Sequence, residues 1–278
     1  MLLAYLNGMH VMWNRWKVNN VKIANIAPDL FLFIGQTYQS NSTIFVSDDG
    51  VLLVDALASD NDAEELRVFV ERELKKDVRL IISTHYFSDH LAALKHFPDA
   101  LIAAHENYLE TFESEQFRSE LEAAHFVAPH LLISDRLSVR WGRHTLNISH
   151  NPGHTSSTLA IHVPEADLLM VGDTLVNNIV YLRYSTPQLF DEALERLGKI
   201  PANKLISSHG DVRTVASISH AAHYLQALAR QVKLTGARPE LKQLQLEDCL
   251  PPNVPAVPFE RIFHERNLQT IIERQLFT

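Results

Sequence analysis

The amino-acid sequence predicts an α/β protein in which two β-sheets pack face to face and helices cover both outer faces. One observation and one packing rule lead to this fold class. Strand-like segments fall into two groups along the chain, with helical segments between and after them. Each sheet of a sandwich has an outer face that must be covered, and amphipathic helices can cover it. The predicted architecture is therefore a four-layer αββα sandwich.

The first half of the chain supplies one group of strands. An apolar run at 30–34 is followed by a hairpin, since strand-like residues 43–46 and 51–55 flank Asp48-Asp49-Gly50. Residues 59–76 carry apolar side chains near a 3.6-residue period, with acidic residues early and lysines at the end, which predicts an amphipathic helix. The other elements predicted in this half are strands at 78–83 and 101–104, a short helix at 91–97 and charged helical structure within 106–126.

The second half supplies the other group of strands. The elements predicted there are strands at 137–141, 145–148, 159–163 and 168–171, a helix at 187–197, a strand at 204–207 and a long helix at 215–234. A proline-rich connector, residues 251–258, leads into a final helix at 259–276. We expect residues 1–250 to form one domain and residues 251–278 to pack on it as a connector and helix.

Composition excludes several classes of protein. The chain has 278 residues, and 25 Lys+Arg against 33 Asp+Glu give a formal net charge of -8, which argues against a nucleic-acid or anionic-membrane partner. No apolar run approaches the ~20 residues of a membrane span, and the single Cys249 cannot form an internal disulfide. Residues 1–13 are apolar but lack the leading basic residues of a secretory signal. We expect them to pack on the body as a short extension of a cytoplasmic protein.

Histidines mark the candidate chemistry. The chain contains 15 of them, and imidazole is both the commonest metal ligand and the usual proton carrier near neutral pH. Directly after the predicted strand at 78–83, His85, Asp89 and His90 lie within six residues. A helix would not direct all three to one point, whereas a loop can. Such mixed nitrogen and oxygen sets bind zinc and related metals.

Three further residues occupy equivalent places in the chain. His154 follows a Pro-Gly turn, Asp173 comes after an apolar strand, and His209 comes after the strand at 204–207. Taken singly, each is more often a cap or a turn residue. Because all of them follow predicted strands, their loops can converge at the rim of the two sheets. Together with the first loop they form a candidate metal site.

In this order the motifs resemble the metallo-β-lactamase superfamily, whose signature is a His-x-His-x-Asp-His loop, a Pro-Gly-His turn, a Gly-Asp strand end and a late His. The resemblance covers about residues 21–210, including Asp55 at the end of the first hairpin. It implies the four-layer sandwich of that family, here with a C-terminal helical extension. It also implies a metal-dependent hydrolase that uses a metal-activated water to cleave an ester, thioester or amide/lactam bond of a small molecule.

The chain departs from the family pattern at Phe87, which stands where the family loop has its second His. The resemblance then implies one well-held metal ion per chain, zinc by preference, with iron or manganese as alternatives. Its implied ligands are Asp89, His90, Asp173 and His209. The first site keeps only His85 and His154 and would be weak or empty. A dinuclear site completed by Tyr86 or Ser88 is the alternative.

The resemblance also implies catalytic roles. Asp89 would orient the attacking water or move its proton, and His85 and His154, if free of metal, would act as general base or oxyanion donors. Two other functions stay open. One is a degenerate binding or scaffold protein of the same fold, and the other is an iron-dependent oxidoreductase.

Weaker signals concern the substrate and partners. The candidates for lining a pocket beyond Asp173 are Asn177, Asn178, Tyr181, Arg183 and Tyr184. The final helix has an apolar stripe that suits core packing, a pocket lid or a homodimer contact, formed by Phe259, Ile262, Phe263 and Leu268. We expect a small-molecule substrate and no nucleic-acid or membrane partner.

Overall fold

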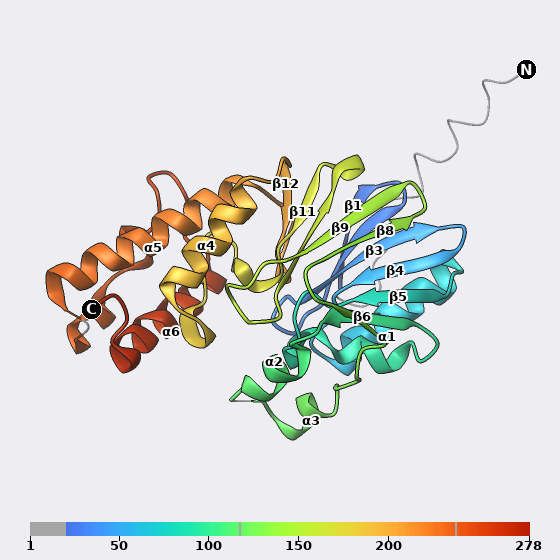
Figure 1. Cartoon of the computed structure of the whole chain (residues 1–278), viewed down its shortest axis with the longest axis horizontal. Helices are drawn as coiled ribbons and strands as arrows, with labels where there is room; N and C mark the ends of the chain where they lie inside the picture. Colours follow the sequence, from blue (N-terminus) through green and yellow to red (C-terminus); the bar gives the residue numbers. More distant parts are fainter. Residues whose placement is uncertain (1–20, 117, 237) are drawn as a thin grey trace, which may run out of the picture.

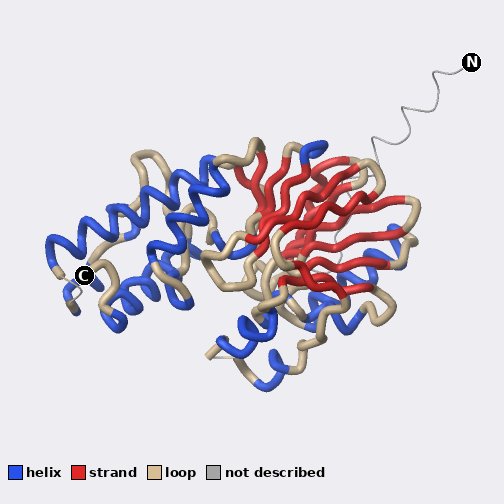
Figure 2. The backbone as a smooth tube through the Cα atoms, in the orientation of Figure 1, coloured by secondary structure: helices blue, strands red, loops and turns tan. Residues whose placement is uncertain are grey.

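The computed structural model describes residues 21–116, 118–236 and 238–278. Two β-sheets face each other, and helices pack against the outer side of each (Figures 1 and 2). The predicted four-layer sandwich is confirmed. The extension predicted for residues 1–13 lies outside the described residues.

The first sheet has seven strands that neighbour one another in chain order. They are β1 (Lys22–Ala27), β2 (Leu30–Ile34), β3 (Asn41–Ser47), β4 (Gly50–Val54), β5 (Val78–Ile82), β6 (Leu101–His105) and β7 (Leu131–Ile133). Strands β1 to β4 pair antiparallel, and β4 to β7 pair parallel. The predicted hairpin is β3–β4, in which Ser47 pairs with Gly50.

Helical segments cover the outer face of this sheet. Helix α1 (Asp60–Val68) is capped by Ser59, whose side chain accepts a hydrogen bond from the Asp62 amide. The helix continues as a π-helical segment over Phe69–Leu74. The charged region predicted as helical is divided, because α2 (Tyr108–Ser114) ends before Glu115 and α3 (Glu120–Ala123) starts at a new capping box. A 3₁₀ segment occupies Ala92–His96, within the predicted short helix.

The second sheet has six strands in the order β13, β12, β11, β10, β9, β8. They are β8 (Arg136–Trp141), β9 (His144–His150), β10 (Leu159–Val163), β11 (Leu168–Met170), β12 (Lys204–Ile206) and β13 (Arg213–Thr214). Strands β11 and β12 pair parallel, and helix α4 (Pro187–Gly198) lies in the crossover between them. The other pairs in this sheet are antiparallel.

Strands β1, β7 and β13 have no counterpart among the predicted elements, and all three lie at sheet edges. Their side chains are mostly exposed or half-buried. An edge strand is covered incompletely, so its sequence carries little of the alternation by which a strand is recognised. These strands are defined by pairing with a neighbour rather than by their own residues.

The C-terminal part of the chain builds the helical layer on the second sheet. Helices α5 (Ala216–Thr235) and α6 (Pro258–Arg274) pack with α4 in one apolar cluster. Of the predicted apolar stripe on α6, Leu268 is buried and Phe259 and Phe263 pack against that cluster, whereas Ile262 is 48% exposed. None of the helices in the described part of the chain combines the length and apolar character needed to cross a membrane.

A separate apolar cluster fills the space between the sheets. It includes Leu32 and Leu52 from the first sheet and Ile148 and Ile161 from the second. Burial of such side chains on both sheets fixes their relative position, since close-packed interiors tolerate little displacement. The loops that leave β5, β9, β11 and β12 therefore emerge at one rim of a rigid sandwich.

Candidate metal centre

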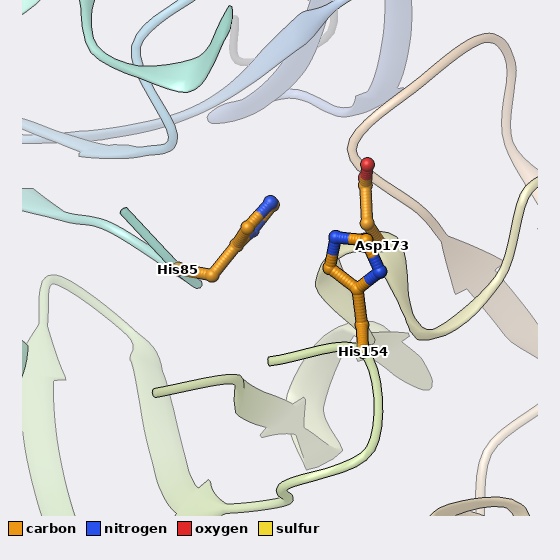
Figure 3. A group of neighbouring side chains, drawn as sticks. All are labelled: His85, His154 and Asp173. Carbon is orange, nitrogen blue, oxygen red and sulfur yellow. The ribbon is translucent and has the colours of Figure 1, made fainter. Parts of the chain in front are cut away.

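Six sequence-predicted side chains meet at this rim. They are His85, Asp89 and His90 from the loop after β5, His154 from the loop after β9, Asp173 after β11 and His209 after β12. They form two groups of three, and within each group the candidate ligand atoms lie within 4.8 Å of one another. One group is His85, His154 and Asp173, whose side chains extend toward a common space (Figure 3). The other group is Asp89, His90 and His209.

Asp173 connects the two groups. Its Oδ2 lies 3.1 Å from His209 Nε2 and 3.7 Å from His90 Nε2. Asp89 lies on the same side, with its carboxylate oxygens 3.3 Å from His90 Nε2 and 3.6 Å from His209 Nε2. The ring centroids of His85 and His90 are 4.4 Å apart. The six residues therefore form one continuous cluster that contains two carboxylates and four imidazoles.

Two glycines allow the loops to approach this cluster. A Cβ on Gly153 would lie 2.6 Å from the Cβ of Ala193, so the Pro-Gly-His turn can pack against α4 only without a side chain at this position. Gly172 has a φ of 57°, and a Cβ there would lie 2.9 Å from the hydroxyl of Thr84. The two glycines thus bring His154 and Asp173 close to the loop after β5.

Buried polar contacts fix the orientation of the loops. Asp55 accepts hydrogen bonds from the Thr84 amide at 2.7 Å, the Thr84 hydroxyl at 2.8 Å and the Ser208 hydroxyl at 2.6 Å. It thereby joins the residue before His85 to the residue before His209. The Nδ1 of His209 donates to the carbonyl of Tyr38 at 2.9 Å, so Nε2 is the nitrogen that faces the carboxylates.

The alternative ligands Tyr86 and Ser88 have other partners. The Tyr86 hydroxyl donates to the carbonyl of Val127, and the Ser88 hydroxyl donates to Glu115 at 2.8 Å. Glu115 also accepts from the Ser88 amide at 3.0 Å, so this carboxylate stabilises the loop next to Asp89. The third candidate ligand atom beside His85 and His154 belongs instead to Asp173.

Phe87 packs against the His85 and His154 side of the cluster. Its ring centroid lies 5.4 Å from that of His85 and 5.2 Å from that of His154, both in edge-on arrangements. The ring centroid of Tyr184 lies 4.6 Å from that of Phe87. Phe87 offers no ligand atom, and its ring makes this half of the cluster more apolar than the half that contains Asp89.

Several buried polar atoms of the cluster have no hydrogen-bond partner. These are His85 Nε2, both ring nitrogens of His90, both ring nitrogens of His154 and Asp173 Oδ1. Buried nitrogen and oxygen atoms normally find a partner, because leaving them unpaired costs free energy. Imidazole nitrogens and a carboxylate oxygen gathered in this way are the ligands that zinc, iron and manganese bind. The residues present therefore fit a divalent metal ion.

The two halves of the cluster differ in protonation. Burial lowers the pKa of His154 to about 4 and that of His85 well below its usual range, so both are neutral imidazoles near pH 7. Burial also opposes the charge of His90, but Asp89 and Asp173 outweigh it and raise the pKa of His90 to about 10. The pKa of His209 is raised in the same way, with burial opposing and Asp173 as the main favourable partner.

The cluster lies at one side of a cavity of about 480 Å³. The lining residues include Phe87, Asp89, His154, Asp173 and His209, together with Tyr38, Glu115, Glu122, Tyr181, Arg183, Tyr184, Phe263, Arg266, Gln269, Thr270 and Glu273. Tyr181, Arg183 and Tyr184 were among the predicted lining residues. Asn177 and Asn178 do not line it, because Asn177 accepts from Arg213 and Asn178 donates to buried Glu260.

The contribution of α6 to the cavity wall is the main part of the site that sequence reasoning missed. In the sequence, Phe263 is part of the apolar stripe, for which a pocket lid is one interpretation. The polar residues of the same wall gave no separate signal, since charged and amide side chains on a helix are usually solvated. Helical spacing is the one feature by which these residues could be grouped with Phe263, since Arg266 follows it by three residues and Thr270 follows Arg266 by four.

Comparisons with known proteins agree with this architecture. The family described as "Metallo-beta-lactamase superfamily" matches residues 35–209, which is more than half of the chain and includes the six clustered residues. Metallo-beta-lactamase type 2 of Bacillus cereus is 24% identical, over 71% of this chain and 77% of that protein.

Solved structures share the fold at low sequence identity. A metallo-beta-lactamase from Pontibacter korlensis gives a TM-score of 0.63 at 19% identity and covers 74% of this chain and 99% of its own. The stereoselective inverting sec-alkylsulfatase Pisa1 from Pseudomonas sp. gives a TM-score of 0.66 at 16% identity, covering 91% of this chain and 50% of its own. The present chain thus spans half the length of that alkylsulfatase. On the family match and the shared fold, the chain belongs to the metallo-beta-lactamase superfamily.

Proposed function

We propose that this protein is a metal-dependent hydrolase that cleaves an ester, thioester or amide/lactam bond of a small molecule. The observation that carries the proposal is the set of buried imidazole and carboxylate atoms beside the cavity that have no hydrogen-bond partner. A purely structural cluster would be expected to satisfy these atoms with neighbouring side chains. Family membership supports the same reaction class.

The metal would be held by Asp89, His90, Asp173 and His209, in a ratio of one ion per chain. Asp89 belongs to this half, and Asp173, which connects the two groups, contacts both of its imidazoles. Zinc suits such nitrogen and oxygen ligands, and iron or manganese would suit them as well. In the family pattern the position of Phe87 is a histidine, so the half with His85 and His154 lacks one imidazole. Asp173 Oδ1 is the atom that could join those two in a weaker second site.

The chain's own residues then divide the catalytic work. When bound, a divalent ion supplies a water of lowered pKa and polarises the scissile carbonyl. Asp89 is partly exposed, with 24% of its side chain accessible, and lines the cavity, so it can orient the attacking water and accept its proton. His154 also lines the cavity and is neutral near pH 7, so its lone pair can act as a base.

A sulfate ester is a second candidate for the bond that is cleaved. The alkylsulfatase Pisa1 covers 91% of this chain, against 74% for the Pontibacter lactamase. Two arginines, Arg183 and Arg266, lie in the cavity wall beside the cluster, and guanidinium groups bind sulfate-like anions well. This candidate keeps the same metal site and changes only the substrate.

The test combines metal content with turnover. The full chain is purified, loaded with zinc, manganese or iron, and its metal is counted by elemental analysis. It is then assayed with 4-nitrophenyl acetate, an acyl thioester, a chromogenic β-lactam and a secondary alkyl sulfate. One ion per chain together with metal-dependent turnover of any of these supports the proposal. Bound metal without turnover of any of them favours the binding or scaffold protein, and activity that requires iron and consumes oxygen favours the oxidoreductase.

A further inference from the structure

One face of helix α6 forms one wall of the cavity. Phe263, Arg266, Thr270 and Glu273 follow one another at intervals of three or four residues, and all four line the cavity with Gln269. Residues at this spacing lie on one face of a helix. One face of α6 is therefore directed at the candidate metal centre, although α6 contributes none of the six clustered residues.

Buried hydrogen bonds hold this wall in a fixed position. Asn267, which is fully buried, accepts from the Leu182 amide at 2.7 Å and donates to the Val180 carbonyl at 2.6 Å. Glu260, also fully buried, accepts from the amide and the side chain of Asn178 at 3.0 and 2.9 Å. The wall is thus bonded to the segment that follows Asp173, so both surfaces of the cavity keep their spacing.

A row of aromatic rings leads away from the candidate metal centre toward α6. Phe87, which touches His154, lies 4.6 Å from Tyr184, and Tyr184 lies 6.1 Å from Tyr181. Tyr181 in turn lies 5.0 Å from Phe263. All four rings line the cavity. They offer an apolar surface along which the body of a substrate can lie.

Arg266 lies at the far end of this row of rings. Its guanidinium carbon is 5.4 Å from the centroid of Phe263. The other arginine of the wall, Arg183, is paired with Glu273 at 2.9 Å. In the part of the chain that the structure describes, no ion pair joins Arg266 to a carboxylate. Arg266 interacts with the Tyr181 hydroxyl, which is neutral near pH 7, so its positive charge is not balanced by a carboxylate and can attract an anion that enters the cavity.

We propose that Arg266 binds an anionic group at the end of the substrate remote from the bond that is cleaved. The substrate class is then an ester, thioester or amide with an apolar body and a terminal carboxylate or similar anion. The cleavable bond would lie at the cluster, the apolar body along the four rings, and the anion at Arg266. This inference rests on the proposed function, since it assumes that the cluster is where the reaction occurs.

The test compares two esters that differ only in the terminal charge. Mono-4-nitrophenyl suberate carries a carboxylate at the end of an eight-carbon acyl chain, and 4-nitrophenyl octanoate carries a methyl group there. With the zinc-loaded full chain we expect kcat/KM to favour the suberate about tenfold, as one charge-assisted hydrogen bond provides. Arg266→Gln should remove this preference through KM with kcat little changed, and Arg266→Lys should retain part of it.

Arg261→Gln is the matched control. Arg261 is an exposed arginine of the same helix that pairs with Glu247 and does not line the cavity. Its substitution should leave the tenfold preference intact. Equal kcat/KM for the two esters, or a preference that survives Arg266→Gln, would overturn the inference while the hydrolase function stands.

A binding measurement separates failure of the inference from failure of the function. If neither ester is hydrolysed, the affinities of suberic acid monoanilide and octananilide are measured by calorimetry with wild type and Arg266→Gln. Tighter binding of the anionic anilide that is lost in Arg266→Gln supports the anion site even in a protein without esterase activity. Equal affinities in wild type overturn it.

Discussion

The two halves of the candidate metal centre come from the same loops but differ in charge and surroundings. In one half, the carboxylates of Asp89 and Asp173 raise the pKa values of His90 and His209 against the effect of burial. His85 and His154 lie in the more apolar half beside Phe87, and burial keeps both neutral. The two halves thus differ in the charge of their imidazoles, because two carboxylates favour the charged form in one half and burial beside an apolar ring favours the neutral form in the other.

Asp173 belongs to both halves, so its loss should have the largest effect. Asp173→Ala removes the carboxylate that contacts His90, His209 and the His85 group. We expect zinc content to fall from about one ion per chain to near zero and kcat/KM to fall by about 10³-fold or more, because the ion supplies the nucleophile. Elemental analysis and steady-state kinetics measure both. Glu122→Gln, also in the cavity wall, is the control and should retain its metal.

The apolar half should matter for turnover and little for metal content. His154→Ala or His85→Ala removes a neutral imidazole, and loss of a general base costs about 10²- to 10⁴-fold in rate. We therefore expect kcat to fall within that range while zinc stays near one ion per chain. Loss of zinc from either variant would mean that these residues are ligands, and the two halves would then be equivalent.

The pKa difference between the halves gives a smaller effect on stability. Burial lowers the pKa of His154 to about 4, whereas an unfolded histidine titrates near 6.5. The unfolded chain therefore binds more protons in this window, so stability is full above about pH 6.5 and falls as the pH drops toward 4. We expect metal-free protein to lose about 2 kcal/mol from this residue between pH 7 and pH 5.

Urea unfolding of chelator-treated protein at these two pH values measures the loss. His154→Gln should lose less stability on acidification than wild type. His90 contributes in the opposite sense, because a folded pKa of about 10 gives stability that is lost as the pH rises above 6.5. Equal acid sensitivity in wild type and His154→Gln would argue against a neutral, buried imidazole in this half.

Much of the fold followed from local pattern in the sequence. The hairpin around Gly50, the long helices and the position of each clustered residue after a strand depend on periodicity and turn residues, which are local. The edge strands β1, β7 and β13 depend on pairing with a neighbour, and their own residues carry little signal. The division of the charged segment 106–126 at Glu115 is likewise not a local feature, since Glu115 accepts hydrogen bonds from Ser88 in a distant loop.

The residues of the candidate site were predictable from the sequence, but their spatial grouping was not. The six clustered residues could be chosen because their types and places in the chain are unusual. Their division into two groups could not, because it depends on the distances from Asp173 to loops far away in sequence. The wall contributed by α6 depends on buried contacts such as Asn267 with Leu182, which join segments about 85 residues apart.

We propose that Phe87 leaves one well-held metal ion where two complete halves would hold two. The most direct measurement is elemental analysis of zinc-loaded wild type beside Phe87→His, with Phe87→Leu as a control that changes packing without adding a ligand. We expect about one ion per chain in wild type and Phe87→Leu, and about two in Phe87→His. Two ions in wild type, or one in Phe87→His, would contradict it.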